Sequence, residues 1–125
     1  MPSKATILNF KNKTELQIKD TFIGTGLETV KGALLLCQYE GYLEDGIKFD
    51  SSFDHGRPFQ FVFGAKRVIQ GWDLGLIGMR EGGKRTLFIP SHLAYGERNI
   101  GKFITPNSNL IFKIELIEVK PRENN

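Results

Sequence analysis

The sequence predicts an α+β fold in which one short helix lies against a β-sheet. Most apolar segments alternate with polar residues, which is the period of two that β-strands show. The 14 glycines among 125 residues exceed the ~7% average and indicate many tight turns. Only residues 68–79 are predicted to form a helix, because their apolar side chains recur at a helical spacing, and a lone short helix must bury its apolar side against the sheet.

The strand pattern recurs along the whole chain, with turn residues between the segments. The predicted strands cover residues 16–22, 33–39, 47–51, 59–63, 85–89 and 110–119. The last of these also fits a helix, because Leu110, Ile111, Ile114 and Ile117 follow a helical spacing. Its β-branched and aromatic content, together with the preceding turn at Pro106–Asn109, favours a strand. The apolar alternation shifts by one residue after Leu116, to Ile117 and Val119, which indicates a bulge in that strand.

The predicted helix contains the only tryptophan of the chain, Trp72. Ile69, Trp72, Leu76 and Met79 recur at spacings near 3.6 and define its apolar side. Glycines at 71, 75 and 78 lower the helix propensity but allow the backbone to approach the sheet closely. Trp72 therefore either fills the core or forms the floor of a pocket.

Two other parts of the chain stand apart from the strand pattern. Residues 91–109 form a long loop, which in a compact domain is more often functional than passive, and its Ile100, Phe103 and Ile104 are expected to be exposed. We expect one domain at residues 14–120. Residues 1–13 are expected to form an N-terminal extension, loose or as an added edge strand, and residues 121–125 a tail.

Composition limits the possible partners and compartments. The net charge of +3 comes from scattered basic and acidic residues, which indicates a solvated surface and argues against nucleic-acid binding. No apolar run approaches the roughly 18 residues of a membrane-spanning helix, and residues 1–13 lack the apolar core of a signal peptide. The single cysteine, Cys37, rules out an internal disulfide and suits a reducing compartment, so we expect a cytoplasmic protein. We also expect a monomer that does not contact a membrane.

Common catalytic motifs are missing from the sequence. His55 and His92 stand alone without the paired spacing of a metal site, and neither a Gly-x-Ser-x-Gly elbow nor a Walker loop occurs. Cys37 lies within a predicted strand, where a thiol is usually an inert small hydrophobe. Asp50 and Asp54 could form an acid/base pair, although a lone aspartate more often caps a turn or accepts from a tyrosine hydroxyl. We expect no metal and no cofactor.

Aromatic side chains are the feature that these exclusions leave unexplained. They form either a phenylalanine-rich core or a concave apolar cleft with a few polar groups at its rim. The residues in question are Tyr39, Phe49, Phe59, Phe61, Trp72, Tyr95 and Phe112.

Over roughly residues 15–119 the chain resembles the FKBP-type peptidyl-prolyl cis-trans isomerases, the macrolide-binding class. Each matching motif is weak alone, but all six occur in order at spacings typical of the family. The motifs are Gln38–Gly41, Asp45–Ser52, Pro58–Phe61, Val68–Trp72, Ala94–Arg98, and Pro106–Asn107 with Leu110–Phe112.

The resemblance implies a half-open, twisted antiparallel sheet of about five strands wrapped around one short helix. It also implies an isomerase that accelerates rotation about X-Pro bonds in an apolar aromatic cleft, assists protein folding and binds macrolide inhibitors. The groups implied in catalysis are Tyr95, Asp50, Tyr39 and Phe49, and those implied in binding are Phe59, Val68, Ile69, Trp72, Ile104 and Phe112.

Specific roles follow from the same resemblance. Trp72 would form the floor of the cleft, and Ile104 its lip. The Tyr95 hydroxyl and the Ile69 N–H would donate to carbonyls of a proline-containing peptide or a macrolide. Asp50 would accept a hydrogen bond from Tyr39 and orient it.

The chain departs from the family pattern in its long loop, at Ile100, Phe103 and Thr105. These departures leave substrate preference open. Two other functions also stay open at this point. One is a non-catalytic module that binds proline-containing partner segments in the same cleft. The other is a small nucleic-acid-binding β domain, suggested only by basic charge and exposed aromatic residues.

Overall fold

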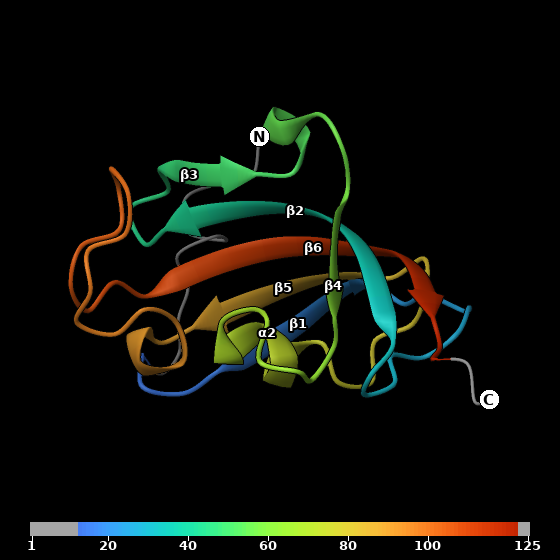
Figure 1. Cartoon of the computed structure of the whole chain (residues 1–125). Coiled ribbons are helices and arrows are strands. Elements are labelled where there is room, and N and C mark those ends of the chain that lie inside the picture. Colours follow the sequence, from blue (N-terminus) through green and yellow to red (C-terminus); the bar gives the residue numbers. More distant parts are fainter. Residues whose placement is uncertain (1–12, 123–125) are drawn as a thin grey trace.

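The computed structural model describes residues 13–122, which form one six-stranded antiparallel β-sheet and one α-helix (Figure 1). The helix α2 spans Gln70–Gly75, and two 3₁₀ turns, η1 (Phe53–His55) and η2 (Ser91–Leu93), lie in the connections. The strands are β1 (Gln17–Phe22), β2 (Leu34–Leu43), β3 (Lys48–Ser51), β4 (Phe59–Val62), β5 (Lys84–Ile89) and β6 (Leu110–Lys120).

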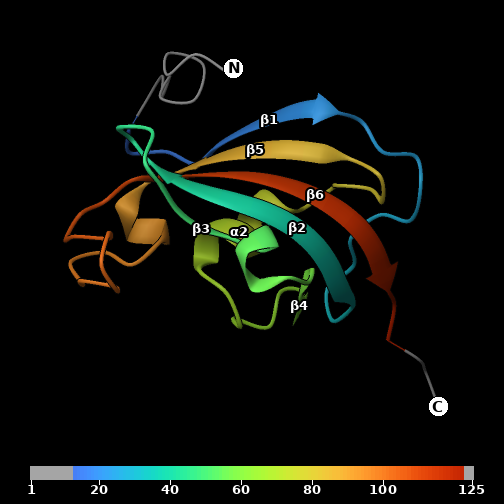
Figure 2. The ribbon, with the colours of Figure 1, turned by 90° about the horizontal axis from the view of Figure 1, so that it is seen from above.

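The strands follow the spatial order β1-β5-β6-β2-β3, and β4 also pairs with β2. Because β6 covers one edge of β2 along its length, the two short strands β3 and β4 pair with different halves of its other edge. The sheet therefore has one strand more than the expected number of about five. Figure 2 shows α2 on one side of the twisted sheet, which confirms the predicted α+β fold.

The apolar alternation of the sequence determines which side of the sheet faces the helix. In β2, Leu35 and Cys37 are fully buried, and Tyr39 on the same side is half-buried. In β6 the pairing slips where Leu36 faces Glu118 and Cys37 faces Leu116, which leaves Ile117 as the extra residue of a bulge. The predicted strand with a bulge is thus confirmed, and Val119 beyond the bulge is buried again.

Two glycines let α2 lie unusually close to strand β5. A Cβ atom at Gly71 would overlap the Ile89 side chain, and one at Gly75 would lie 2.7 Å from Cδ1 of Leu87. The helix is shorter than its sequence pattern indicated, since Ile69 and Leu76 are its caps. Met79 lies beyond the helix but is buried in the same core.

Polar contacts anchor α2 at its C-terminal end and to the segment that precedes it. At the C-terminal end, the buried Arg85 guanidinium donates to the carbonyls of Gly75 (2.9 Å) and Ile77 (2.8 Å). The same guanidinium pairs with Asp20 of β1, with 2.6 Å between Nε and Oδ1. These bonds satisfy carbonyls that a helix end leaves without intrahelical partners. Toward the N-terminal side, the Asp73 carboxylate accepts from the Gly64 N–H at 2.8 Å.

Several sequence expectations can be compared with this fold. Most of the expected extension at residues 1–13, including its Ile7–Leu8 patch, and most of the tail at 121–125 lie outside the described residues. Within the described part, no helix is long and apolar enough to cross a membrane. Cys37 is free and buried, and burial raises the pKa of its thiol to about 12.

The expectation that Ile104 is exposed was wrong. Its side chain is only 6% exposed, whereas Phe103 beside it is 42% exposed and Ile100 is half-buried. Ile100 and Ile104 exchange two backbone hydrogen bonds, of 2.8 and 3.3 Å, which close a turn between them. The Ile104 side chain packs with the main core as a result.

The contact between α2 and β5 predicts the effect of Gly71→Ala. Alanine favours helices over glycine by ~1 kcal/mol, but here its methyl group would overlap Ile89, so we expect a net destabilisation of about 1–3 kcal/mol. Chemical denaturation measures the change. Gln70→Ala, at an exposed position of the same helix, is the control and should change stability by less than about 0.5 kcal/mol. Equal stability of the Gly71→Ala variant and the original protein would contradict the close contact.

Candidate active site

A cleft of about 180 Å³ opens between α2, the strands β2 to β4 and β6, and the loop after η2. Aromatic and aliphatic side chains make up most of its wall, which also carries two charged groups and the hydroxyls of two tyrosines. The lining residues are Tyr39, Phe49, Asp50, Phe59, Arg67, Val68, Ile69, Trp72, Tyr95 and Phe112.

The Trp72 indole lies at the centre of the aromatic cluster and is 3% exposed. The rings of Tyr39 and Phe112 each lie 5.3 Å from it, nearly perpendicular, at 83° and 85°. Phe59 and Phe61 contact it edge-on at 5.8 and 5.6 Å. Aromatic pairs prefer this edge-to-face geometry because the positive edge of one ring meets the negative face of another. Among the described residues, the indole N–H has no hydrogen-bond acceptor.

A short hydrogen bond joins two of the polar groups. The Tyr39 hydroxyl donates to Oδ2 of Asp50 at 2.7 Å, and the Ser51 N–H donates to Oδ1 of the same carboxylate at 2.9 Å. The structure therefore places Asp50 against a tyrosine hydroxyl. Asp54, the other aspartate considered, lies instead 3.9 Å from Lys48 and is largely exposed.

Tyr95 and Ile69 bring hydrogen-bond donors to the cleft. Tyr95 follows η2, and burial together with the nearby Asp50 charge raises the pKa of its phenol, while Arg98 lowers it. The hydroxyl thus keeps its proton and can donate at neutral pH. Ile69 is the N-cap of α2, and an N–H group at that position has no intrahelical acceptor.

Two further hollows adjoin the cleft and share residues with it. One, of about 180 Å³, lies against the long loop and includes Phe49, Asp50 and Tyr95 together with residues 100–104. The other, of about 340 Å³, lies beside η1 and includes Tyr39 and Phe59 together with Ser52, His55, Arg57 and Pro58. The concave surface of the cleft therefore continues on two sides, toward the long loop and toward η1.

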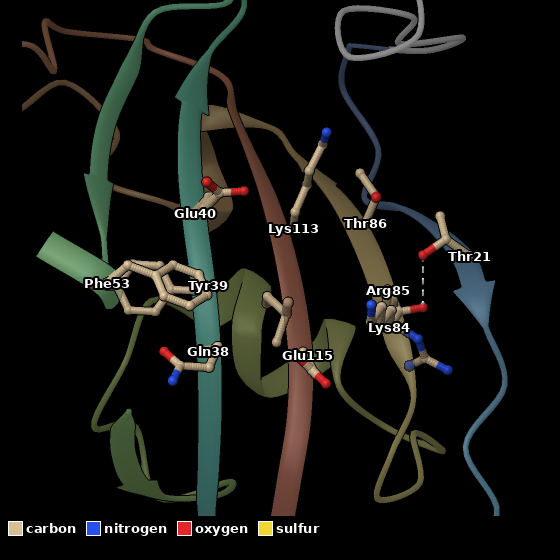
Figure 3. Close-up of a pocket in the computed structure, with 11 residues that line it drawn as sticks. Thr21, Gln38, Tyr39, Glu40, Phe53, Lys84, Arg85, Thr86, Lys113 and Glu115 are labelled. Carbon is tan, nitrogen blue, oxygen red and sulfur yellow. Dashed lines mark hydrogen bonds between the residues drawn. The ribbon is translucent and has the colours of Figure 1, made fainter. Parts of the chain in front are cut away.

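The opposite side of the sheet carries a different kind of hollow, of about 290 Å³ (Figure 3). Glu40 of β2, Lys113 of β6 and Thr86 of β5 stand side by side there, in register across three strands. The Thr21 hydroxyl donates to the Lys84 carbonyl at 3.3 Å. This face mixes both signs of charge, so it lacks the concentrated basic surface that nucleic-acid binding requires.

Nine of the ten site residues that the sequence implied line the cleft, and the tenth, Ile104, lines the hollow beside the loop. Sequence reasoning missed Arg67, whose position beside the Val68–Trp72 motif was the available signal. It also treated His55 as isolated. In the structure, Nε2 of His55 lies 3.0 Å from Oδ1 of Asp50.

The groups of this site can bind an apolar ring and polarise a carbonyl group by hydrogen bonding. Among residues 13–122, no group of three histidine, cysteine, aspartate or glutamate side chains could hold a metal ion. The cleft combines apolar walls with the hydroxyl and N–H donors of Tyr95 and Ile69. It can therefore remove an apolar ring and an adjoining amide from water while donating hydrogen bonds to carbonyl oxygens.

Comparisons with known proteins agree on one family. A family model described as FKBP-type peptidyl-prolyl cis-trans isomerase matches residues 26–117, which include the whole cleft. The FK506-binding protein of Neisseria meningitidis serogroup A is 49% identical over 104 residues, covering 83% of this chain and 95% of that protein. The human peptidyl-prolyl cis-trans isomerase FKBP2 is 42% identical over 118 residues, covering 94% of this chain and 83% of that protein.

Solved structures show the same relationship. The crystal structure of AtFKBP13 superposes with a TM-score of 0.80 at 44% identity and covers 86% of this chain and 94% of that one. The structure of FkpA from Escherichia coli gives a TM-score of 0.79 at 35% identity, covering 94% of this chain and 56% of that one.

The surroundings of Tyr39 predict how its phenol affects the stability of the protein at alkaline pH. Burial, the hydrogen bond to Asp50 and the Asp50 charge all raise the pKa of Tyr39 above its ordinary value. Above pH ~10 the unfolded chain therefore loses a proton that the folded protein keeps, so the free energy of unfolding should fall as the pH rises further. Below pH ~10 this contribution should be constant.

Phenolate absorbance measures this titration. Comparison with Tyr39→Phe identifies the step that belongs to Tyr39. Asp50→Asn should lower the pKa of Tyr39 only in part, because burial, the largest cause, stays in place. A Tyr39 step at the ordinary tyrosine value would contradict the buried position of the hydroxyl.

Proposed function

The chain belongs to the family of FKBP-type peptidyl-prolyl cis-trans isomerases, and we propose that it accelerates rotation about X-Pro bonds in the cleft above Trp72. The observation that carries this proposal is the meeting of nine residues, implied by the family motifs and scattered from 39 to 112, around one cavity. We propose that the proline ring lies against the Trp72 indole, between the rings of Tyr39, Phe59 and Phe112.

Removal of the peptide bond from water supports catalysis. Rotation faces a barrier of ~18–20 kcal/mol because amide resonance is lost in the twisted state. The planar amide separates more charge than the twisted amide, so water stabilises the planar form more. An aromatic cleft that replaces this water raises the ground state relative to the transition state, which lowers the barrier.

Two donors complete the proposed mechanism. The Tyr95 hydroxyl and the Ile69 N–H donate to substrate carbonyls and hold them in the geometry of the twisted state. Asp50 accepts from Tyr39 at 2.7 Å and fixes the orientation of that wall residue. In this mechanism Asp50 orients and polarises, and no proton transfer or covalent intermediate is needed.

The same cleft is proposed to bind macrolide inhibitors, in keeping with relatives named FK506-binding proteins. Proline-containing segments of unfolded or partner proteins are the proposed natural ligands. We also propose a monomer, and a reducing compartment such as the cytoplasm, in keeping with a single cysteine that can form no internal disulfide. A non-catalytic binding module would use the same wall residues, and no feature of the cleft favours it over the enzyme.

The proposed donor predicts the effect of Tyr95→Phe on isomerisation of a proline-containing peptide. Loss of one hydrogen bond, worth ~0.5–1.5 kcal/mol, should lower kcat/KM by about two- to ten-fold. Asp50→Ala should lower it as well, because Tyr39 loses its acceptor. A protease-coupled assay measures the rate, and circular dichroism checks that each variant is folded.

Tyr42→Phe is the matched control, because Tyr42 packs with Phe88 and Ile111 and lies apart from the cleft. Its activity should equal that of the original protein. If the original protein is no faster than solvent, the isomerase proposal fails and the binding module takes its place.

The proposed floor predicts weaker macrolide binding in Trp72→Leu, by roughly ten-fold or more, because the ligand loses a flat ring contact. Calorimetry with FK506 measures the affinity. Since Trp72 is also a core residue, Phe59→Leu, at a partly exposed wall position, serves as a second variant that is expected to fold. Phe22→Leu, at an exposed position of β1, is the control. Unchanged affinity in both Trp72→Leu and Phe59→Leu would remove the aromatic cluster from the binding site.

A further inference from the structure

A histidine that the proposed mechanism does not use contacts Asp50 from the hollow beside the cleft. Nε2 of His55 lies 3.0 Å from Oδ1 of Asp50, while Oδ2 of the same carboxylate accepts from Tyr39. A carboxylate only accepts hydrogen bonds, so the imidazole nitrogen that faces it carries a proton. The two oxygens of Asp50 are therefore held from two sides, one by the cleft wall and one by His55.

Local folding brings His55 back over Asp50. Strand β3 ends at Ser51, and η1 turns the chain immediately afterwards. The Ser51 hydroxyl accepts from the Asp54 N–H at 3.1 Å, which fixes the first part of this turn. Gly56 then closes the turn in the left-handed region, at φ 73°. A residue five positions after Asp50 thereby reaches its carboxylate.

We propose that His55 is a positioning residue of the isomerase site, which holds the Asp50 carboxylate toward Tyr39 more firmly when its imidazole is protonated. The inference rests on the proposed function. A neutral imidazole donates one hydrogen bond to the carboxylate, whereas the imidazolium adds the attraction between opposite charges, so the contact becomes an ion pair. The His55 side chain is 63% exposed, so solvent protons reach it directly. Activity should therefore rise as the pH falls through the range in which histidines titrate.

Other charged and titratable groups lie near His55 and Asp50. Lys48 and Asp54 pair with each other beside η1, and Arg57 lines the same hollow as His55. Arg67 and Tyr95 line the cleft together with Asp50, and the nearby charge of Arg98 lowers the pKa of Tyr95. Lys102 lines the hollow on the loop side, and Tyr39 bonds Asp50 directly. Of these residue types, only histidine normally changes charge between pH 5 and 8, so a pH dependence in that range reports on an imidazole.

The pH profile of kcat/KM between 5.5 and 8.5 tests the inference, with a blocked peptide substrate that has no titratable group. The original protein should gain about two- to five-fold toward low pH, the range that an exposed ion pair supports. His55→Arg keeps a positive charge at every pH and should give a flat profile near the higher value. His55→Gln keeps a neutral donor and should give a flat profile near the lower value.

His92→Gln is the matched control, because His92 is the only other histidine of the chain and is exposed. This variant should keep the full pH dependence. A profile that stays pH-dependent in His55→Gln, or an active original protein with a flat profile, would overturn the inference and leave the isomerase proposal intact. Inactivity of the original protein at every pH would instead remove the proposed function.

Nuclear magnetic resonance provides a readout that does not depend on activity. The Tyr39 ring should give a different chemical shift in His55→Gln and in the original protein at low pH, because the Asp50 carboxylate joins the two side chains. The same comparison with His92→Gln should show no difference at Tyr39. Unchanged Tyr39 signals in His55→Gln would show that the 3.0 Å contact does not position Asp50 and would overturn the inference.

Discussion

The close packing of helix α2 on strand β5 is the constraint on which the site depends. Gly71 and Gly75 face Ile89 and Leu87 with no room for a side chain, so only glycine at these two positions lets the helix lie this close to the sheet. Trp72 is adjacent to Gly71 and is thereby brought within ring contact of Tyr39 and Phe112, which come from β2 and β6. With larger residues at these two positions, the helix would move away from the sheet, and Trp72 would lose its ring contacts with Tyr39 and Phe112.

This arrangement makes one set of aromatic contacts serve both stability and binding. The Trp72 ring is almost fully buried and belongs to the main core, yet it also lines an open cavity. A concave apolar surface of this kind stays rigid because each ring is held edge-on by others. The cleft is thus formed by core packing, and a preformed apolar surface lowers the cost of ordering on binding.

Local patterns predicted the parts of the fold that depend on nearby residues. The slip of phase near Ile117 was visible in the sequence, because a bulge shifts the apolar alternation by one residue. The inward turn of Ile104 was not visible, since it depends on the paired backbone bonds between residues 100 and 104. The contact between His55 and Asp50 was missed for a similar reason. A separation of five residues matches neither helix nor strand periodicity, so only the η1 turn brings the two side chains together.

The contrast between the buried floor and the exposed loop segments indicates where proteins with this fold can differ in substrate preference. The floor is constrained by core packing, because any change at Trp72 or Gly71 alters contacts with the sheet. The two hollows beside the cleft are instead formed by η1 with its following residues and by the loop at 100–104, where Phe103, His55 and Arg57 are exposed. Substitutions there alter charge and shape at little cost in stability. Recognition of the residues that flank proline is therefore expected to reside in these two segments, whereas the buried floor is expected to be shared by proteins that have the same close helix packing.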